Sequence, residues 1–165
     1  VASKPFDGEG VPTRKKKVVE KGVLKTLLHN LTTAAKQGVA TTGNAARGYA
    51  SAVGVAPTNF YIAPSEENVE AMLARMGEGF LITEISGLHA GANQFSGDFS
   101  LLAKGYAVHD GKKAEAVKQI TVAGNFFEVL KDVVAVASDL EFGLPGGCLV
   151  GSPTVWVKAL SVAGK

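Results

Sequence analysis

The sequence predicts an α+β fold: a large, mostly antiparallel or mixed β-sheet with about three short helices. Glycine is abundant, at 20 residues without a repeat period, which is typical of many tight turns. Several short apolar stretches rich in β-branched residues are bounded by glycine, and two of them flank the dipeptide Asp110-Gly111. Three further stretches place apolar residues at helical spacing. Together these patterns indicate many strands and few helices.

The composition fits a single domain over residues 1–165, with 46% hydrophobic residues to build a core. A net charge of +2 is too small to indicate direct nucleic-acid binding. The basic cluster at 14–17 is predicted to be a solvated strand end or loop, with a phosphate or partner contact as the alternative. No apolar run approaches the ~20 residues that span a membrane. Cys148 is the only cysteine, and no signal peptide is evident, so we expect a cytoplasmic protein. Because the chain begins at Val1 rather than Met, we expect a piece of something longer.

The N-terminal third predicts one hairpin, one helix and a long loop. Residues 1–14 are extended, and residues 17–25 form a hairpin around Lys21-Gly22. A helix that contains His29 ends at Gly38, and its apolar positions are Leu27, Leu28, Leu31, Ala34 and Ala35. Residues 38–56 form a mobile or partner-contacting loop whose only permanent charge is Arg47. Its GxxxxG spacing lacks the Lys-Ser/Thr of a phosphate-binding loop.

The middle of the chain predicts a strand, a helix and a long hairpin. Residues 57–63 form the strand, and Ser65 caps a helix that ends at Gly77 and buries Val69, Met72, Leu73 and Met76. An apolar strand at 80–85 leads into a polar, glycine-rich loop, and a second strand runs from Phe99 to His109. Asp110-Gly111 favours a type I′ turn, so residues 114–122 return antiparallel.

The C-terminal part predicts a helix between strands. Asn125 is an N-cap with Glu128 three residues later, a capping-box arrangement for a short helix from Phe126. Residues 133–137 form a β-branched strand, residues 143–147 a turn, and residues 154–162 a single closing strand.

The sequence contains no local catalytic or metal-binding motif. The three histidines are isolated, and neither HExxH, HExxxH nor a GxSxG elbow is present. Cys148 and His89 form a conceivable nucleophilic pair, but the apolar Leu149 beside the thiol favours a buried structural cysteine. We therefore assign no catalytic and no metal-ligating residue to this chain.

The loop between the central strands is the main candidate site. In one interpretation His89, Ser96 and Asp98 converge on a ligand or partner. In the other, Asn93, Ser96 and Asp98 hydrogen-bond the loop backbone in Asx- and ST-turns. The residues alone leave both interpretations open.

Several motifs, in order, resemble the C-terminal region of the TldD/PmbA family, also labelled modulator of DNA gyrase. The chain contains PFDGEGVPT at 5–13, TTGNAARG at 41–48, GLHAGAN at 87–93, SGDFS at 96–100, ITVAGN at 120–125, GSPT at 151–154 and LSVAG at 160–164. The residues of the Thr83-Glu84…GLHAGAN and ITVAGN runs resemble the PmbA (TldE) branch more closely than TldD. The resemblance covers nearly the whole chain.

The resemblance implies a subunit of a two-protein cytoplasmic peptidase that acts on unfolded peptides. A TldD-like partner would carry zinc through an HExxxH motif and a late cysteine, so no cofactor is expected in this chain. The PmbA-type subunit would help to enclose the peptide, and any effect on DNA gyrase would be indirect. Residues expected to contact peptide or partner are Arg47, Glu84, His89, Asn93, Ser96 and Asp98.

Two departures limit what the resemblance implies. The HExxxH motif would lie N-terminal to the matched region, and the late cysteine should align near Asp139, whereas Cys148 is only five residues before Pro153. A metal-ligand role is therefore not carried over to Cys148. Three hypotheses stay open: a non-catalytic PmbA-like subunit, a fragment of a catalytic TldD-like peptidase, and a structural or regulatory module. Self-association of the fragment is also left open.

Overall fold

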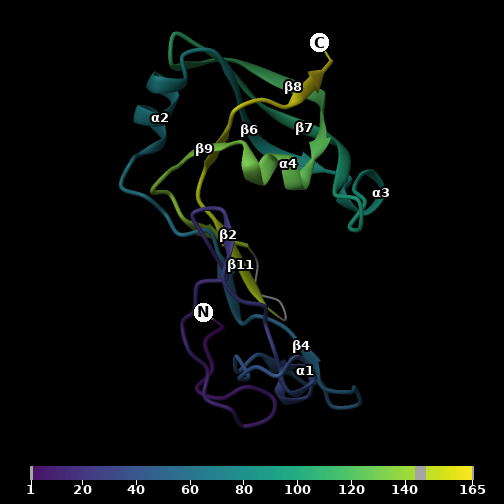
Figure 1. The fold of residues 1–165 in the computed structure, drawn as a ribbon. Coiled ribbons are helices and arrows are strands. Elements are labelled where there is room, and N and C mark those ends of the chain that lie inside the picture. Colours follow the sequence, from purple (N-terminus) through teal and green to yellow (C-terminus); the bar gives the residue numbers. More distant parts are fainter. Residues whose placement is uncertain (1, 144–147, 165) are drawn as a thin grey trace. The chain divides into compact units, whose positions relative to one another are not determined.

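The computed structural model describes residues 2–143 and 148–164. Most of the turn predicted at 143–147 therefore lies outside the described residues. The chain divides into two compact units: unit 1 comprises Val1–Ile62 and Glu141–Ser152, and unit 2 comprises Ala63–Leu140 and Pro153–Lys165. The described residues form four helices and several small sheets, which confirms the α+β fold class (Figure 1). The largest of these sheets has four strands.

Unit 1 begins with a loop held by Asp7 and continues into the predicted hairpin. The Asp7 carboxylate accepts hydrogen bonds from the backbone N–H groups of Glu9, Val11 and Ala45, at 2.9 to 3.0 Å. Strands β1 (Val19–Glu20) and β2 (Val23–Leu24) are antiparallel. Both turn residues between them have positive φ, as a type I′ turn requires, which confirms this prediction.

Helix α1 (Leu31–Gln37) starts later than the sequence predicts. Asn30 is extended and its side chain accepts the Thr33 N–H at 2.8 Å, so the helix cannot extend back over Leu27 and Leu28. The placement of His29 in the helix is wrong: its N–H donates to Thr42 Oγ1 at 2.6 Å and the residue is buried. The predicted end is correct, because Gly38 adopts the left-handed conformation with φ 66°.

The predicted long loop at 38–56 contains a short hairpin, formed by β3 (Ala45–Ala46) and β4 (Gly54–Val55). In the basic cluster at 14–17, Arg14, Lys15 and Lys17 are exposed, as predicted, whereas Lys16 is half-buried. Arg14 donates to the Thr41 carbonyl at 3.0 Å, and Lys16 donates to Asn44 Oδ1 at 2.8 Å. Unit 1 also holds a three-stranded sheet in the order β10-β11-β5. Its strands are β5 (Asn59–Tyr61), which lies parallel to β11, β10 (Glu141–Phe142), and β11 (Leu149–Ser152).

In unit 2 the first helix is α2 (Val69–Met76). Its N-cap is Asn68, whose side chain accepts the Ala71 N–H at 2.8 Å, and not Ser65 as predicted. The Ser65 hydroxyl donates instead to the Val136 carbonyl, which fixes it outside the helix. The predicted buried stripe is correct at Met72 and Leu73, whereas Val69 and Met76 are only half-buried.

The main sheet of unit 2 has the antiparallel order β13-β8-β7-β6. Its strands are β6 (Gly79–Ser86), β7 (Asp98–His109), β8 (Lys112–Asn125) and β13 (Ser161–Ala163). Alternate residues of β7 are buried from Leu101 to Ala107, as expected for a strand with one face on a core. Ala103, Ile120 and Val122 form the centre of that core.

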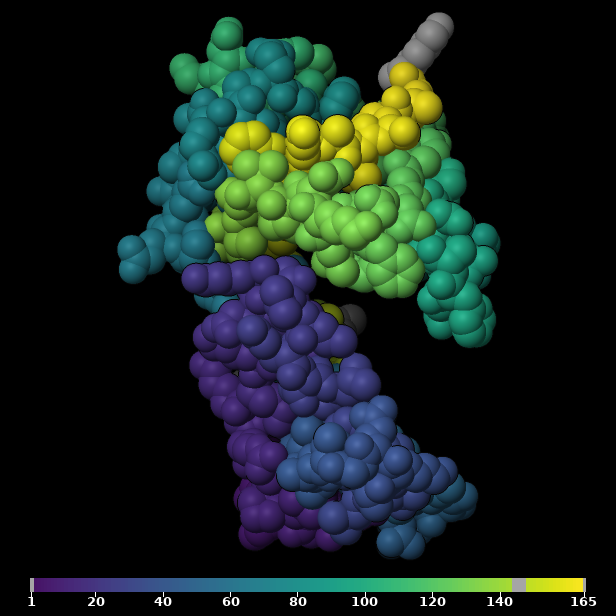
Figure 2. Space-filling model, in the orientation of Figure 1, coloured from purple at the N-terminus to yellow at the C-terminus, as the bar shows by residue number. Residues whose placement is uncertain are grey.

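Two predictions near the C-terminus are wrong in detail. Helix α4 (Phe126–Lys131) is capped by Asn125 as predicted, but Glu128 pairs with Lys131 at 2.8 Å and completes no capping box. The single closing strand is interrupted: β12 (Val155–Val157) pairs with β9 (Val133–Val136), whereas β13 pairs with β8. Figure 2 shows the yellow C-terminal residues against the light-green α4 region, where the Lys158 N–H donates to the Asp132 carbonyl at 2.9 Å.

Candidate functional site

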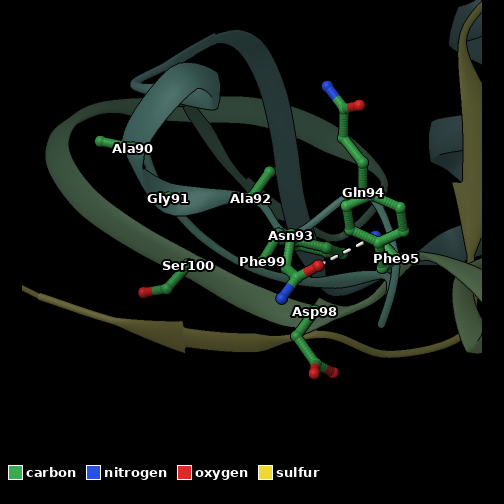
Figure 3. A pocket seen from close by; sticks show the side chains of 9 residues that line it. All are labelled: Ala90, Gly91, Ala92, Asn93, Gln94, Phe95, Asp98, Phe99 and Ser100. Carbon is green, nitrogen blue, oxygen red and sulfur yellow. Dashed lines mark hydrogen bonds between the residues drawn. The ribbon is translucent and has the colours of Figure 1, made fainter.

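The segment between β6 and β7 forms the candidate site. It contains α3 (Leu88–Gly91), a short helix that the sequence does not predict, followed by a tight polar turn. Together with the start of β7 it borders an open hollow of about 730 Å³ (Figure 3). The lining residues are Ala90, Gly91, Ala92, Asn93, Gln94, Phe95, Asp98, Phe99 and Ser100. The site is therefore made almost entirely from one continuous stretch of chain.

Asn93 organises the polar turn. Its side-chain oxygen accepts the backbone N–H groups of Phe95 at 2.9 Å and Ser96 at 3.1 Å (the former is dashed in Figure 3). Its own N–H donates to the Asp98 carbonyl, and its carbonyl accepts the Gly97 N–H. The Asx-turn interpretation of Asn93 is thus correct. Since these contacts occupy the Asn93 side-chain oxygen, its amide nitrogen is the group left for an outside contact.

Asn125, at the end of β8, ties the turn to the sheet. Its Nδ2 donates to the Ser96 carbonyl at 2.9 Å and to Asp98 Oδ1 at 2.8 Å, while its Oδ1 accepts the Phe127 N–H at 3.0 Å. The bond from Asn125, and a weaker one from Ser96, hold the pKa of Asp98 below its usual value. Asp98 is therefore a carboxylate at neutral pH, and it points away from Gln94 and Phe95 (Figure 3).

Gly97 permits the close approach of the turn to α4. Its φ of 82° lies in the left-handed region, and a Cβ built on it would lie 2.7 Å from the Phe127 ring. The Gly97 carbonyl also accepts the Phe126 N–H at 2.7 Å. A side chain at this position would displace Phe127 or open the turn, so the shape of the site depends on this glycine.

The remaining predicted contact residues lie on different elements of the fold. His89 lies in α3 with its side chain exposed, in the same segment as the polar turn. Glu84 lies on β6, where it pairs across the strands with Lys104 at 2.7 Å. Arg47 is exposed after β3 and belongs to unit 1, whereas the other five residues belong to unit 2. The segment between β6 and β7 therefore contains His89, Asn93 and Ser96, and Asp98 is the first residue of β7.

The sequence interpretation missed the apolar part of the site. Phe95 is 96% exposed, at the tip of a polar turn, and Leu88 is 62% exposed in α3. A large aromatic residue between polar residues of a glycine-rich loop was the available signal for Phe95. Asn125 was predicted as a helix cap only, because its bonds to the turn link residues 27 and 29 positions apart.

The Cys148 thiol, which the sequence predicts to be buried, is half-buried just before β11. His89 is exposed in α3. Over residues 2–143 and 148–164, no group of three or more His, Cys, Asp or Glu side chains is placed to hold a metal ion. Asp139, near which the family's late cysteine would align, accepts hydrogen bonds from the backbone and hydroxyl of Thr154, at 2.9 and 2.7 Å. The described residues therefore do not bring together the side chains that a zinc site requires.

None of the helices in the described ranges has the length and apolar character to cross a bilayer.

The family relationship follows from sequence. A family profile described as the PmbA/TldA metallopeptidase C-terminal domain matches residues 1–164. The chain belongs to the PmbA/TldD family. The resemblance noted from the motifs is thereby confirmed.

Relatives in the PmbA/TldD family share both sequence and fold with the chain. The Metalloprotease PmbA homolog of Haemophilus influenzae is 37% identical over 142 residues, which are 86% of this chain and 29% of that protein. A Thermotoga maritima protein, whose name proposes that it modulates DNA gyrase, has a crystal structure with a TM-score of 0.87. It is 47% identical, and the match covers 98% of this chain and 36% of that one.

The fold is also that of TldE from Thermococcus kodakarensis, with a TM-score of 0.85, 24% identity, and coverage of 98% of this chain and 36% of that chain. The chain thus spans about three tenths of the length of the curated relative and somewhat over a third of the solved structures. Relatives in the family carry names of metalloproteases or of gyrase modulators.

Proposed function

We propose that this chain is the C-terminal domain of a PmbA/TldE-type subunit that works with a TldD-like partner in a cytoplasmic zinc metallopeptidase. The subunit itself does not carry the metal, and the complex cleaves unfolded peptides. The observation that supports this proposal is the family match along residues 1–164. The zinc of the TldD-like partner would supply an activated water for hydrolysis. Any influence on DNA gyrase is indirect, through peptide processing.

In this proposal the segment between β6 and β7 contacts the peptide or the partner, together with Arg47 and Glu84. Three features support the assignment. His89 and Phe95 are exposed, the hollow is open, and Asp98 contributes a negative charge to its border. Gly97 and Asn125 hold this segment in one shape before any ligand arrives, which reduces the entropy lost on binding.

Strand addition is the binding mode that suits the sheet. Among the described strands only β7 pairs with β6, so the other edge of β6 has main-chain groups available to an extended peptide. Main-chain pairing tolerates many side-chain sequences, which is what recognition of unfolded peptides requires.

A pull-down tests the assembly. The longer protein that contains this chain should retain a TldD-like protein, and the pair should cleave an unfolded peptide that neither component cleaves alone. A pair that assembles but cleaves no unfolded peptide would refute the peptidase role. Upstream sequence gives an independent test, because an HExxxH motif there contradicts a non-catalytic subunit.

A point variant tests the contact surface. His89→Ala should weaken peptide or partner binding several-fold without lowering the free energy of unfolding, since His89 is exposed. Glu66→Ala is the matched control, because Glu66 is also exposed in unit 2 but lies before α2. Equal binding by both variants would exclude His89 from the contact surface.

A further inference from the structure

The turn between β7 and β8 is seated on the C-terminal end of α2. The Asp110 N–H donates to Glu78 Oε1 at 2.9 Å, and the Gly111 N–H donates to the Gly77 carbonyl at 2.8 Å. A Cβ on Gly111 would lie 2.5 Å from the Ala74 Cα, so the backbones are in close contact there. The tip of the longest hairpin is therefore attached to a helix by a few contacts, one of which is to the side chain of Glu78.

His109 lies between two carboxylates at this attachment. Its Nδ1 is 2.8 Å from Glu78 Oε2, and its Nε2 is 3.5 Å from Glu115 Oε1 on β8. A neutral imidazole has one N–H and can donate to only one carboxylate, whereas the imidazolium donates from both nitrogens. The arrangement of two acceptors around one ring is thus satisfied by the protonated form. The same Glu78 carboxylate that binds His109 also accepts the Asp110 N–H, which couples the ring to the turn.

The other charged groups nearby do not replace this arrangement. Lys112 is the register partner of His109 on β8, and Asp110 follows His109 in the turn. From α2, the Arg75 guanidinium is bound to Glu67 at 2.9 Å and lies 5.2 Å above the Trp156 ring. Among the described residues, the recorded ion pairs of Glu78 and Glu115 are both with His109.

We propose that protonated His109 is a pH-sensitive clasp that holds the β7–β8 turn on the end of α2, and that loss of its proton loosens the turn. The clasp does not depend on the proposed peptidase function. It makes the attachment of this hairpin tip respond to pH near neutrality, where histidine is the side chain that ordinarily titrates.

The direction of the pH response follows from both partners. The hydrogen bond to Glu78, then that to Glu115, raise the pKa of His109. The stability that protonated His109 contributes is therefore complete below the ordinary histidine pKa of about 6.5. It is lost as pH rises through the higher pKa of His109 in the folded protein. The Asp110 N–H, then His109, lower the pKa of Glu78, so its contribution is present above the ordinary value and is lost as pH falls through the lower folded one. The clasp is therefore strongest at pH values between the lowered pKa of Glu78 and the raised pKa of His109.

An NMR titration with amide exchange tests the clasp on the whole chain. The pKa of His109 should exceed the ordinary histidine value and should fall in both Glu78→Gln and Glu115→Gln. Protection of the Gly111 amide, after correction for intrinsic exchange, should drop by about 1.5- to 5-fold as His109 loses its proton, the range that exposed ion pairs support. In Glu78→Gln this drop should disappear.

Glu84→Gln is the control, because Glu84 also forms an exposed ion pair, with Lys104 on the same sheet. It should leave both the His109 titration and the Gly111 protection unchanged. An unshifted His109 pKa, or Gly111 protection that is flat across the His109 titration, would overturn the proposal. A response in Glu84→Gln equal to that in Glu78→Gln would overturn it as well.

Discussion

Replacing Asn125 with alanine should destabilise unit 2 more than the loss of an ordinary helix cap. Asn125 caps α4 through its side-chain oxygen, and the same side chain binds the turn of the candidate site through its nitrogen. Loss of an N-cap costs about 1 kcal/mol of unfolding free energy, and the hydrogen bond to the Ser96 carbonyl adds about 0.5–1 kcal/mol. We therefore expect a loss of about 1.5–2 kcal/mol, and a rise in the pKa of Asp98 towards its usual value because its main hydrogen bond is gone.

Asn68→Ala supplies the matched control. Asn68 likewise caps α2 through its side-chain oxygen, which accepts the Ala71 N–H at 2.8 Å, and among the described residues this cap is its one side-chain hydrogen bond. Amide exchange within unit 2 would give both free energies of opening, and carboxyl NMR would follow Asp98. Asn125→Ala should be the more destabilising of the two, with the extra loss concentrated around the turn. Equal losses, or an unchanged Asp98 titration, would show that Asn125 does not anchor the site.

Three further predictions concern the turn, the acid limit and the core. Gly97→Ala should cost more than Gly87→Ala in thermal unfolding, since both glycines have positive φ but a Cβ at Gly87 meets nothing within 4 Å; equal costs would contradict the contact with α4. Burial tends to raise the pKa of Asp7, but backbone donors, first that of Ala45, lower it by more. The stability that Asp7 contributes to unit 1 should thus be lost as pH falls below about 4, and Asp7→Asn should remove this dependence in acid titrations followed by amide exchange. Met72→Ala should destabilise unit 2 by about 2–5 kcal/mol in urea unfolding, because Met72 is 2% exposed, and a loss under 1 kcal/mol would contradict its place in the core.

Local sequence signals predicted the parts of the fold that local physics decides. Asp110-Gly111 specified the turn of the longest hairpin, since both residues adopt the positive φ that a type I′ turn requires. Gly38 and Gly77 correctly marked the ends of two helices. In each case the conformation depends on one or two adjacent residues, and few residue types can adopt it.

Helix starts and strand partners were less predictable, because several local solutions compete. Ser65 and Asn68 are both good N-caps, and the bond of Ser65 to the Val136 carbonyl decides between them. The last strand reads as one apolar stretch, yet its two halves pair with β9 and β8. Neither choice is encoded within a few residues, since each depends on a segment distant in the sequence.

The site was predictable in its turn chemistry and not in its attachments. The Asx-turn at Asn93 follows from the local preference of asparagine. The double role of Asn125 and the contact of Gly97 with Phe127 depend on tertiary packing, so no motif in the loop reveals them. The family resemblance supplied the expected role, while the geometry identified Phe95 and Asn125 as further residues to test.

Zinc content is the most direct test of the proposed non-catalytic role. It should be measured, together with peptide cleavage, on the longer protein that contains this chain, on its TldD-like partner, and on the assembled pair. We predict stoichiometric zinc in the partner and none in the protein that contains this chain. We also predict that only the assembled pair, and neither protein by itself, cleaves unfolded peptide. One zinc per molecule and peptide cleavage by the protein that contains this chain, without any partner, would contradict the proposal.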